Sequence, residues 1–443
     1  MAYQSLEKLF YKDSSADRYA RNTALASERL NAESTFRTGI DTPAGELFLA
    51  VPHELLTLSE DVMGAERRIS SLLAGLPYVV QGALVRSLVV DEVVCTNELE
   101  GVSSTRKQIS DLLENDLLAA PAAPPSASSS AAPTRRRFRE LARLYLGLSD
   151  PEAADRLPRT PADIRAIYDL VMQGEDLGDD APDGALFRKG RVDVIGVGQR
   201  TLHEGVFPES AIVETVRRML DIVNSGEMPP LLGALVGHFV FEYAHPFYDG
   251  NGRTGRYLLA LGLTRSLTAL TALSLSRTIA ESRSRYYRAF KETESQLNRG
   301  ELTMFVLTML EYVREAQRTL IGDLEQKTAL LDLVERAIDE VGAEIAPDNE
   351  DTSAPQSRSL SHSLSNPLPQ RERAIISRLA QQRVFGAFSD VSLDNLVEAA
   401  GVGRQQTRKY LLELEGSGWV VPVSSRPLRF VLSEEACERL RLV

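Results

Sequence analysis

The feature that most constrains the fold is a glycine-rich run, His245 to Arg256, set between two segments with helical apolar spacing. Its G-x-G-x-x-G pattern would mark a dinucleotide-binding fold only after a β-strand and with an acid about 20 residues later. The residues before it instead recur at helical intervals: Leu231, Leu232, Leu235, Val236, Phe239, Val240 and Tyr243. The sequence therefore predicts a helix, a tight glycine loop and a second helix.

The side chains of this run suit a phosphate-handling site. Arg253 and Arg256 lie in the first turn of the second predicted helix, where the helix dipole favours acids over bases. A bound anion would remove that conflict, because free N–H groups at a helix start also bind phosphate. Asp249 is a hard oxygen ligand of the kind Mg²⁺ uses, and His245 titrates near neutrality. The alternative is a helix–turn–helix corner, but several broken local rules together favour a functional site.

The run resembles the Fic family signature HPFx[D/E]GNGRxxR, which it matches at every fixed position. The resemblance implies a mainly α-helical core that transfers AMP from ATP to a Tyr, Thr or Ser hydroxyl of a target protein or of the enzyme itself, with Mg²⁺ or Mn²⁺. It assigns His245 as the general base, Asp249 as the metal ligand and Phe247 as an apolar plug. The phosphates are assigned to Gly250, Asn251, Gly252, Arg253 and Arg256. A related branch that transfers the terminal phosphate carries Lys where this chain has Gly252, so nucleotidyl transfer is favoured.

A short β-hairpin is predicted upstream, because Arg191 to Arg200 alternates polar and apolar residues and then reaches glycines. In Fic proteins the element at this place is a flap. By that resemblance Val192, Val194 and Ile195 would dock an extended target segment through strand addition. A hairpin that only covers the core is the alternative.

A second motif lies far upstream, where Thr96 and Glu100 share one helical face and Gly101 follows as a helix stop. These residues resemble the inhibitory motif [S/T]xxxE[G/N] of Fic proteins. The resemblance implies an inhibitory helix at about residues 90–101, in which Glu100 pairs with Arg256 and takes the partner of ATP's terminal phosphate. Some relatives also remove AMP with the same glutamate, and that activity stays open here.

The length of 443 residues suggests two or three domains. We expect an N-terminal helical region at 1–118, a linker at 119–137, the catalytic core at 138–345, a second linker at 346–370 and a last domain at 371–443. Most of both linkers lacks the apolar content needed to offset ordering entropy. A long helical stretch from Glu301 to Ile345 closes the core.

The last domain resembles a winged helix, with predicted helices at Ser392–Ala400 and Arg404–Leu414 and a hairpin after Trp419. Such domains bind DNA, dimerise or dock proteins. DNA would meet a basic face, but interleaved glutamates weaken that face, so protein contact and DNA both stay open. The basic residues concerned are Arg404, Arg408, Lys409, Arg426 and Arg429.

Composition and charge indicate which partners and which cellular location to expect. A net charge of −12 argues against nonspecific nucleic-acid binding by the whole chain. No apolar run reaches the roughly 20 residues of a membrane span, and the N-terminus lacks a signal-peptide core, so a cytoplasmic protein is expected. Cys95 and Cys437 form no metal or redox motif. Two other classes stay open: a nucleotide-sensing DNA-binding regulator, and a scaffold that binds ATP without turnover.

Overall fold

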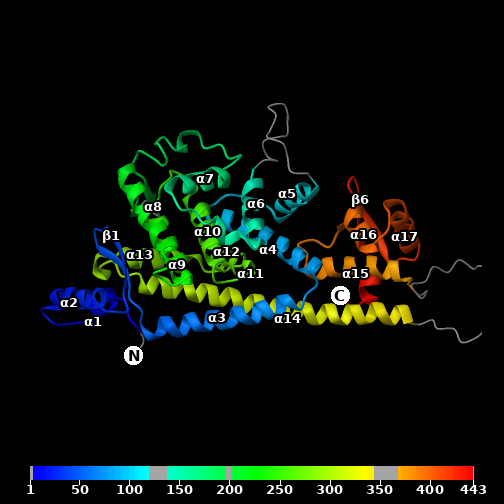
Figure 1. Cartoon of the computed structure of the whole chain (residues 1–443), viewed down its shortest axis with the longest axis horizontal. Helices are drawn as coiled ribbons and strands as arrows, with labels where there is room; N and C mark the ends of the chain where they lie inside the picture. Colours follow the sequence, from blue (N-terminus) through cyan, green and yellow to red (C-terminus); the bar gives the residue numbers. More distant parts are fainter. Residues whose placement is uncertain (1–2, 119–136, 196–200, 344–367, 443) are drawn as a thin grey trace, which may run out of the picture. The chain divides into compact units, whose positions relative to one another are not determined.

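The computed structural model describes residues 3–118, 137–195, 201–343 and 368–442. Within them the chain is mainly α-helical with short antiparallel strands, as the sequence predicts (Figure 1). Its contacts divide it into two units, Met1–Ser71 with Leu88–Ile321, and Leu72–Ser87 with Gly322–Val443. The two predicted linkers fall outside the described residues except for Arg137 and residues 368–370.

The first unit holds the glycine-rich run and most of the helices. Three of its helices, α3, α4 and α14, continue into the second unit. The helices are α1 (Leu6–Lys12), α2 (Arg18–Leu30), α3 (His53–Ala74), α4 (Tyr78–Leu99), α5 (Arg106–Leu118), α6 (Arg139–Leu146), α7 (Pro161–Val171), α8 (Glu209–Asn224), α9 (Pro230–Ala244), α10 (Asn251–Leu263), α11 (Ala269–Ala272), α12 (Leu275–Glu281), α13 (Arg283–Glu294) and α14 (Thr303–Ala343).

Two antiparallel hairpins complete this unit. Strands β1 (Phe36–Thr42) and β2 (Gly45–Leu49) form one of them. Strands β3 (Asp193–Ile195) and β4 (Thr201–Glu204) form the other; β3 lies within the predicted hairpin at Arg191–Arg200, whereas β4 begins just after it. Residues 196–200, between β3 and β4, lie outside the described part of the chain.

Helix α9 is the central element of the first unit. Nearly all of its residues are buried, from Leu231 to Ala244, in keeping with its unbroken apolar sequence. Helices α8 and α10 pack against it. Because α9 is enclosed by other elements, the loop that follows it starts from a fixed position.

The helix that carries the predicted inhibitory motif is anchored by a buried acid. Glu92 of α4 accepts hydrogen bonds from the backbone N–H of Ser276 at 3.0 Å and from the Ser276 hydroxyl, both at the start of α12. Burial raises the pKa of Glu92 to about 7. A buried carboxylate that depends on these donors fixes the position of α4 against the core.

The second unit has its own core and a small sheet. It contains α15 (Gln370–Phe385), β5 (Val391–Ser392), α16 (Leu393–Ala400), α17 (Arg404–Gly416), β6 (Val420–Ser425), β7 (Leu428–Leu432) and α18 (Glu434–Arg439). The strand order is β5–β7–β6. Trp419 is buried in the core together with Val334 and Ile338 of α14. The two predicted helices and the hairpin are thus present, and their assignment to a winged helix stays a prediction.

Two expectations from composition can be compared with the described residues. None of the helices there has the length and hydrophobicity that crossing a bilayer requires. Cys95 and Cys437 are both free thiols, and Cys437 is buried.

Candidate active site

The loop between α9 and α10 contains two left-handed backbone conformations. His245 follows α9 with φ of 46°, and Gly250 precedes α10 with φ of 80°. A non-glycine residue in this region stores strain of about 1 to 3 kcal/mol, which persists only where the surroundings impose it. At Gly250 a Cβ would lie 2.4 Å from Met172 Sδ, so glycine is needed there for space as well.

Arg188 holds the backbone of His245 in this conformation. Its side chain is fully buried and its Nε donates to the carbonyl of His245 at 2.8 Å. Other nitrogens of the same guanidinium donate to the carbonyls of Gly190 at 2.6 Å and Val206 at 2.8 Å. Gly205 leaves room for this, since a Cβ there would lie 2.3 Å from Arg188 NH2. One arginine therefore connects the histidine to the segments on both sides of the hairpin.

Asn251 stabilises the loop from within. Its side-chain Oδ1 accepts from the backbone N–H of Phe247 at 2.9 Å, and its Nδ2 donates to the carbonyl of Phe247 at 2.8 Å. The amide is thus occupied by the loop, and a phosphate contact from this residue would come from its backbone N–H. Phe247 is fully buried, as predicted, and stacks on Tyr168 with ring centroids 3.6 Å apart.

The start of α10 offers unpaired donors. The first N–H groups of a helix, here those of Asn251, Gly252 and Arg253, have no acceptor within the helix. These groups and the helix dipole favour an anion at this end. A Cβ on Gly252 would lie 2.0 Å from Glu100 Oε1, so the carboxylate of Glu100 sits directly against the backbone of this turn.

Glu100 is paired with Arg256, as the sequence predicts. Arg256 NH2 donates to Glu100 Oε1 at 2.8 Å, and its Nε donates to the hydroxyl of Thr96 at 2.8 Å. The Arg256 side chain is 2% exposed and that of Glu100 is 24% exposed. Since the arginine is buried and the acid is partly open, a competing anion would reach Arg256 by displacing Glu100.

Glu100 lies just beyond the last residue of α4. Helix α4 ends at Leu99, and Gly101 has φ of 71°, the left-handed conformation that ends many helices. The N–H of Val102 closes this end on the carbonyl of Asn97 at 2.9 Å. The turn is also held by Tyr287, whose hydroxyl donates to the carbonyl of Leu99 at 3.3 Å. Thr96 and Glu100 thus reach Arg256 from a well-fixed helix end.

Arg253 is engaged by two acids. Its NH1 donates to Glu175 at 2.9 Å, and its NH2 lies 3.4 Å from Asp249. The side chain is 1% exposed, and its buried Nε has no acceptor among the described residues. A buried donor without a partner is uncommon, so this nitrogen is suited to an incoming acceptor.

Asp249 fits a metal that shares its ligands with a phosphate. Its side chain is half exposed, and Oδ1 accepts from the N–H of Gly250 at 2.6 Å. No group of three or more His, Cys, Asp or Glu residues suited to a metal occurs in the described chain. Among the described residues, Asp249 is therefore not part of a site in which such side chains supply three or more metal ligands. One carboxylate combined with phosphate oxygens and waters is the usual arrangement for Mg²⁺.

His245 is unprotonated at neutral pH. Burial is the main cause that lowers its pKa to about 4, and the nearby His203 is the next cause. A neutral imidazole has a free nitrogen lone pair that can accept a proton. The loop therefore presents a base beside an anion-binding helix start.

The part of the chain that builds this loop matches a known family. Residues 158–263 match the model of the Fic/DOC family. Residues 158–263 therefore contain a Fic domain. The match covers α7 to α10, together with the β3–β4 hairpin.

Curated relatives align with part of the chain. It is 30% identical over 117 residues to protein adenylyltransferase fic-1 of Caenorhabditis briggsae, which covers 26% of this chain and 21% of that protein. It is 29% identical over 167 residues to protein adenylyltransferase Fic of Drosophila ananassae, covering 38% and 30%. The alignments thus span less than a third of either relative.

Solved structures of Fic proteins also resemble the chain. A Fic family protein from Desulfovibrio desulfuricans has a TM-score of 0.48 and 19% identity, with 87% of this chain and 97% of that chain covered. Fic-1 from C. elegans has a TM-score of 0.47 and 17% identity, with coverages of 72% and 81%.

The structure brings most of the sequence-predicted residues of the Fic domain together. Glu100 and Thr96 meet Arg256, and Asp249 meets Arg253. For the flap, the backbone of Val194 and Ile195 lies in β3, whereas their side chains lie outside what is described. Val192 precedes the strand, and its carbonyl accepts from the N–H of Gly205 at 3.0 Å. The docking role of these three residues stays a prediction.

Sequence reasoning missed an acid close to Arg256. Glu242 of α9 is half-buried, and loss of solvent raises its pKa to about 7. A Cβ on Gly255 would lie 2.2 Å from its Oε1, which has no hydrogen-bond partner among the described residues. The signal available in the sequence was a lone glutamate in an otherwise apolar helix.

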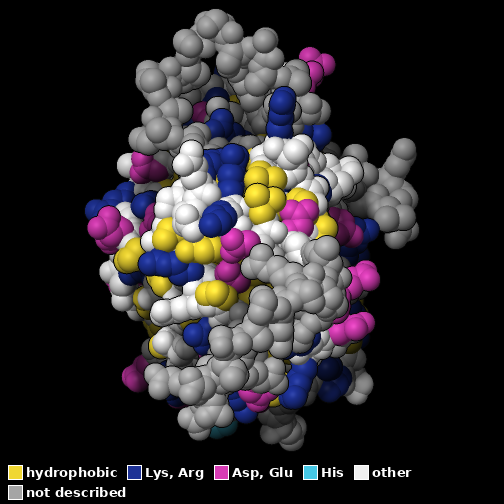
Figure 2. All heavy atoms as spheres, turned by 90° about the vertical axis from the view of Figure 1, so that its right-hand side faces the viewer, with side chains coloured by type: hydrophobic (Ala, Val, Ile, Leu, Met, Phe, Trp, Pro, Cys, Tyr) yellow, Lys and Arg dark blue, Asp and Glu magenta, His cyan; other side chains and the backbone are white. Residues whose placement is uncertain are grey.

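Two of the five basic residues expected to face DNA are neutralised. Arg404 pairs with Asp394 at 2.6 Å, and Arg429 pairs with Asp390. On the face that Figure 2 shows, basic side chains are mixed with acidic and hydrophobic ones. DNA binding and protein binding by the second unit both stay predictions.

Proposed function

We propose that this protein is an adenylyltransferase that transfers AMP from ATP to a hydroxyl group of a protein, and that Glu100 restrains the reaction. The observation that carries the proposal is the pair between Glu100 and Arg256 against the open end of α10, 2.8 Å between donor and acceptor. The names of the curated relatives, protein adenylyltransferase, support the reaction. The acceptor would be a Tyr, Thr or Ser of a target protein or of this chain.

In the proposed reaction the target oxygen bonds to the α-phosphorus of ATP while the bond to the leaving pyrophosphate breaks. The hydroxyl proton passes to His245, whose neutral imidazole is the form that accepts it. The N–H groups of Asn251, Gly252 and Arg253 would stabilise negative charge on the phosphate oxygens, since donors fixed before the reaction need no reorganisation. A magnesium ion held by Asp249 would neutralise phosphate charge when bound.

The same geometry accounts for restraint. Arg256 is a buried cation close to this helix start, and Glu100 pairs with it through a charge-assisted hydrogen bond. Competition between a carboxylate and a phosphate for one arginine reduces productive binding, and about 1.4 kcal/mol of preference lowers it tenfold. Removal of Glu100 should therefore release the reaction, whereas removal of His245 should abolish it.

The test uses the full chain with ATP carrying a label on either the α- or the γ-phosphate, Mg²⁺ and a cell lysate. Glu100→Gly should attach the α-label to protein, and the γ-label should stay in small molecules. Glu100→Gly/His245→Ala should attach neither. Transfer of the γ-label would show a kinase instead, and absence of both labels from Glu100→Gly would contradict the proposal.

A further inference from the structure

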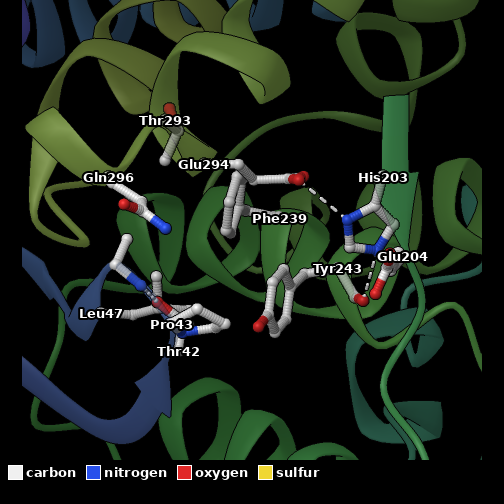
Figure 3. A pocket seen from close by; sticks show the side chains of 11 residues that line it. Thr42, Pro43, Leu47, His203, Glu204, Phe239, Tyr243, Thr293, Glu294 and Gln296 are labelled. Atoms are coloured by element: carbon white, nitrogen blue, oxygen red, sulfur yellow. Dashed lines mark hydrogen bonds and ion pairs between the residues drawn. The ribbon is translucent and has the colours of Figure 1, made fainter. Parts of the chain in front are cut away.

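His203 of strand β4 lies between two hydrogen-bond acceptors close to the candidate active site. Its Nδ1 is 2.8 Å from Glu294 Oε2 at the end of α13, and its Nε2 is 2.8 Å from the backbone carbonyl of Tyr243 in α9 (Figure 3). The side chain is 11% exposed. It forms one wall of a cavity of about 180 Å³ beneath the β1–β2 turn.

These two contacts determine the protonation of the ring. A neutral imidazole donates from one nitrogen and accepts at the other, so it can satisfy only one of two acceptors. A carboxylate and a carbonyl are both acceptors, and both are within hydrogen-bond distance. Only the imidazolium, which donates from both nitrogens, satisfies the pair. In agreement, burial alone would lower the pKa of His203, but Glu294 outweighs it and the pKa is raised.

The positive charge is close to His245. The ring centroids of His203 and His245 are 6.3 Å apart. Tyr243, whose carbonyl binds His203, precedes His245 by two residues in the sequence. The ionisable groups around His203 include Glu294 on α13, Glu242 on α9 and Glu204 on its own strand, whereas the β1–β2 turn contributes none to the cavity wall. Arg188 adds a second positive charge near His245.

We propose that His203 is a positioning residue, held as an imidazolium by Glu294 and Tyr243, whose positive charge adds to burial in favouring the neutral form of His245 and whose two hydrogen bonds tie strand β4 to α9 and α13. The inference rests on the proposed function for its catalytic meaning, because an unprotonated His245 matters as the base. The charge relationship between the two rings holds independently of any transfer reaction. A unit charge at such a separation shifts a pKa by about one to two units at the screening typical of proteins.

The test is an NMR titration of the full-length protein with isotope-labelled histidine rings. The chain has only five histidines, and His245→Ala identifies the signal of His245 by its loss. His203→Gln removes the charge and keeps a donor. His203→Arg keeps the charge, and the adjoining cavity provides room for the longer side chain.

His203→Gln should raise the His245 titration midpoint by about one unit or more, whereas His203→Arg should leave it close to wild type. An unchanged midpoint in His203→Gln, or equal midpoints in both variants, would overturn the proposal. If His203→Gln fails to fold, Glu294→Gln serves instead, because it removes the carboxylate that holds the imidazolium and should also raise the midpoint.

A second readout links the charge to the reaction. In the Glu100→Gly background, the acid limb of the kcat/KM profile should move to higher pH in His203→Gln and not in His203→Arg. A limb that stays in place in an active His203→Gln variant would contradict the role of His203. If no variant transfers AMP, the proposed function fails, and the NMR titration still decides the charge relationship.

Discussion

Arg256 donates to Glu100 at 2.8 Å with one nitrogen and to the hydroxyl of Thr96 at 2.8 Å with another, so two residues of the α4 end share one buried arginine. Arg256 is the sixth residue of α10, in its second turn, and its charge lies near the positive end of the helix dipole. In this state Glu100 supplies the negative charge that a phosphate would otherwise supply.

Thr96→Val should weaken the restraint without removing Glu100. The substitution keeps the side-chain shape but leaves Arg256 Nε buried without its acceptor, and such a bond to a charged group is worth about 1.5 to 3 kcal/mol. We expect AMP transfer to rise about tenfold, less than in Glu100→Gly. Thr96→Ser keeps the hydroxyl and should behave as wild type. Initial rates of labelling measure both, and equal rates for Val and Ser would contradict the role of the hydroxyl.

Arg188→Lys should impair catalysis more than nucleotide binding. Lysine keeps the charge but cannot reach the carbonyls of His245, Gly190 and Val206 together, so the strained backbone of His245 would relax. A misplaced base costs about 100-fold in rate. We expect this loss in kcat in the Glu100→Gly background, with little change in ATP affinity by calorimetry. Arg217→Lys, in an exposed ion pair on α8, is the matched control. An unchanged kcat in Arg188→Lys would disprove the clamp.

Asn251→Ala should destabilise the loop. It removes both hydrogen bonds to the backbone of Phe247 and leaves buried groups unpaired, at a cost of about 1 to 3 kcal/mol for each unsatisfied group. Asn251→Asp keeps the acceptor for the N–H of Phe247, so we expect a smaller loss. Urea unfolding followed by tyrosine and tryptophan fluorescence measures the order, and a midpoint for Asn251→Ala equal to wild type would rule out this structural role.

His238 makes the fold sensitive to acid. Burial is the main reason why its pKa falls to about 3, with the charge of Arg256 as the second cause. Since the folded-state pKa lies below the ordinary value of about 6.5, the unfolded chain binds the extra proton between these values. The contribution to stability is therefore complete above about pH 6.5 and is lost as the pH falls towards 3, by up to about 1.4 kcal/mol per unit.

The measurement compares urea midpoints of wild type and His238→Gln at pH 5 and pH 7. On going from pH 7 to pH 5, His238→Gln should lose less stability than wild type, because it lacks a histidine that is neutral in the folded protein and binds a proton in the unfolded chain. Glu92 and Glu242, whose pKa values are raised to about 7, act in the opposite direction in both proteins and cancel in the comparison. An identical loss in both proteins would show that His238 does not contribute.

The sequence predicted the helices and the loop between them because both depend on local pattern. Apolar spacing placed α9 and α10, and the glycines between them indicated a tight loop. The pairing of Glu100 with Arg256 followed from resemblance, since nothing local joins two residues so far apart in the chain. Local pattern therefore predicted the helices and the loop, and the pairing required the resemblance.

The contacts that orient the site were beyond such reasoning. Arg188 acts on carbonyls brought together by the tertiary fold, so its spacing in the sequence carries no signal. Asn251 was assigned to phosphate, but its side chain holds Phe247, because a buried loop must first satisfy its own backbone. Strand β5 was missed because two residues are too few for a recognisable alternation.

The most direct test of the central claim compares initial rates of AMP transfer by wild type, Glu100→Gly, Glu100→Gln and Glu98→Gln under identical conditions. Glu98 is an exposed acid in the last turn of α4, two residues before Glu100, so its variant controls for the loss of one negative charge. We expect at least about a tenfold rise in both Glu100 variants and a wild-type rate in Glu98→Gln. Equal rates in all four proteins would contradict the restraint of this site by Glu100.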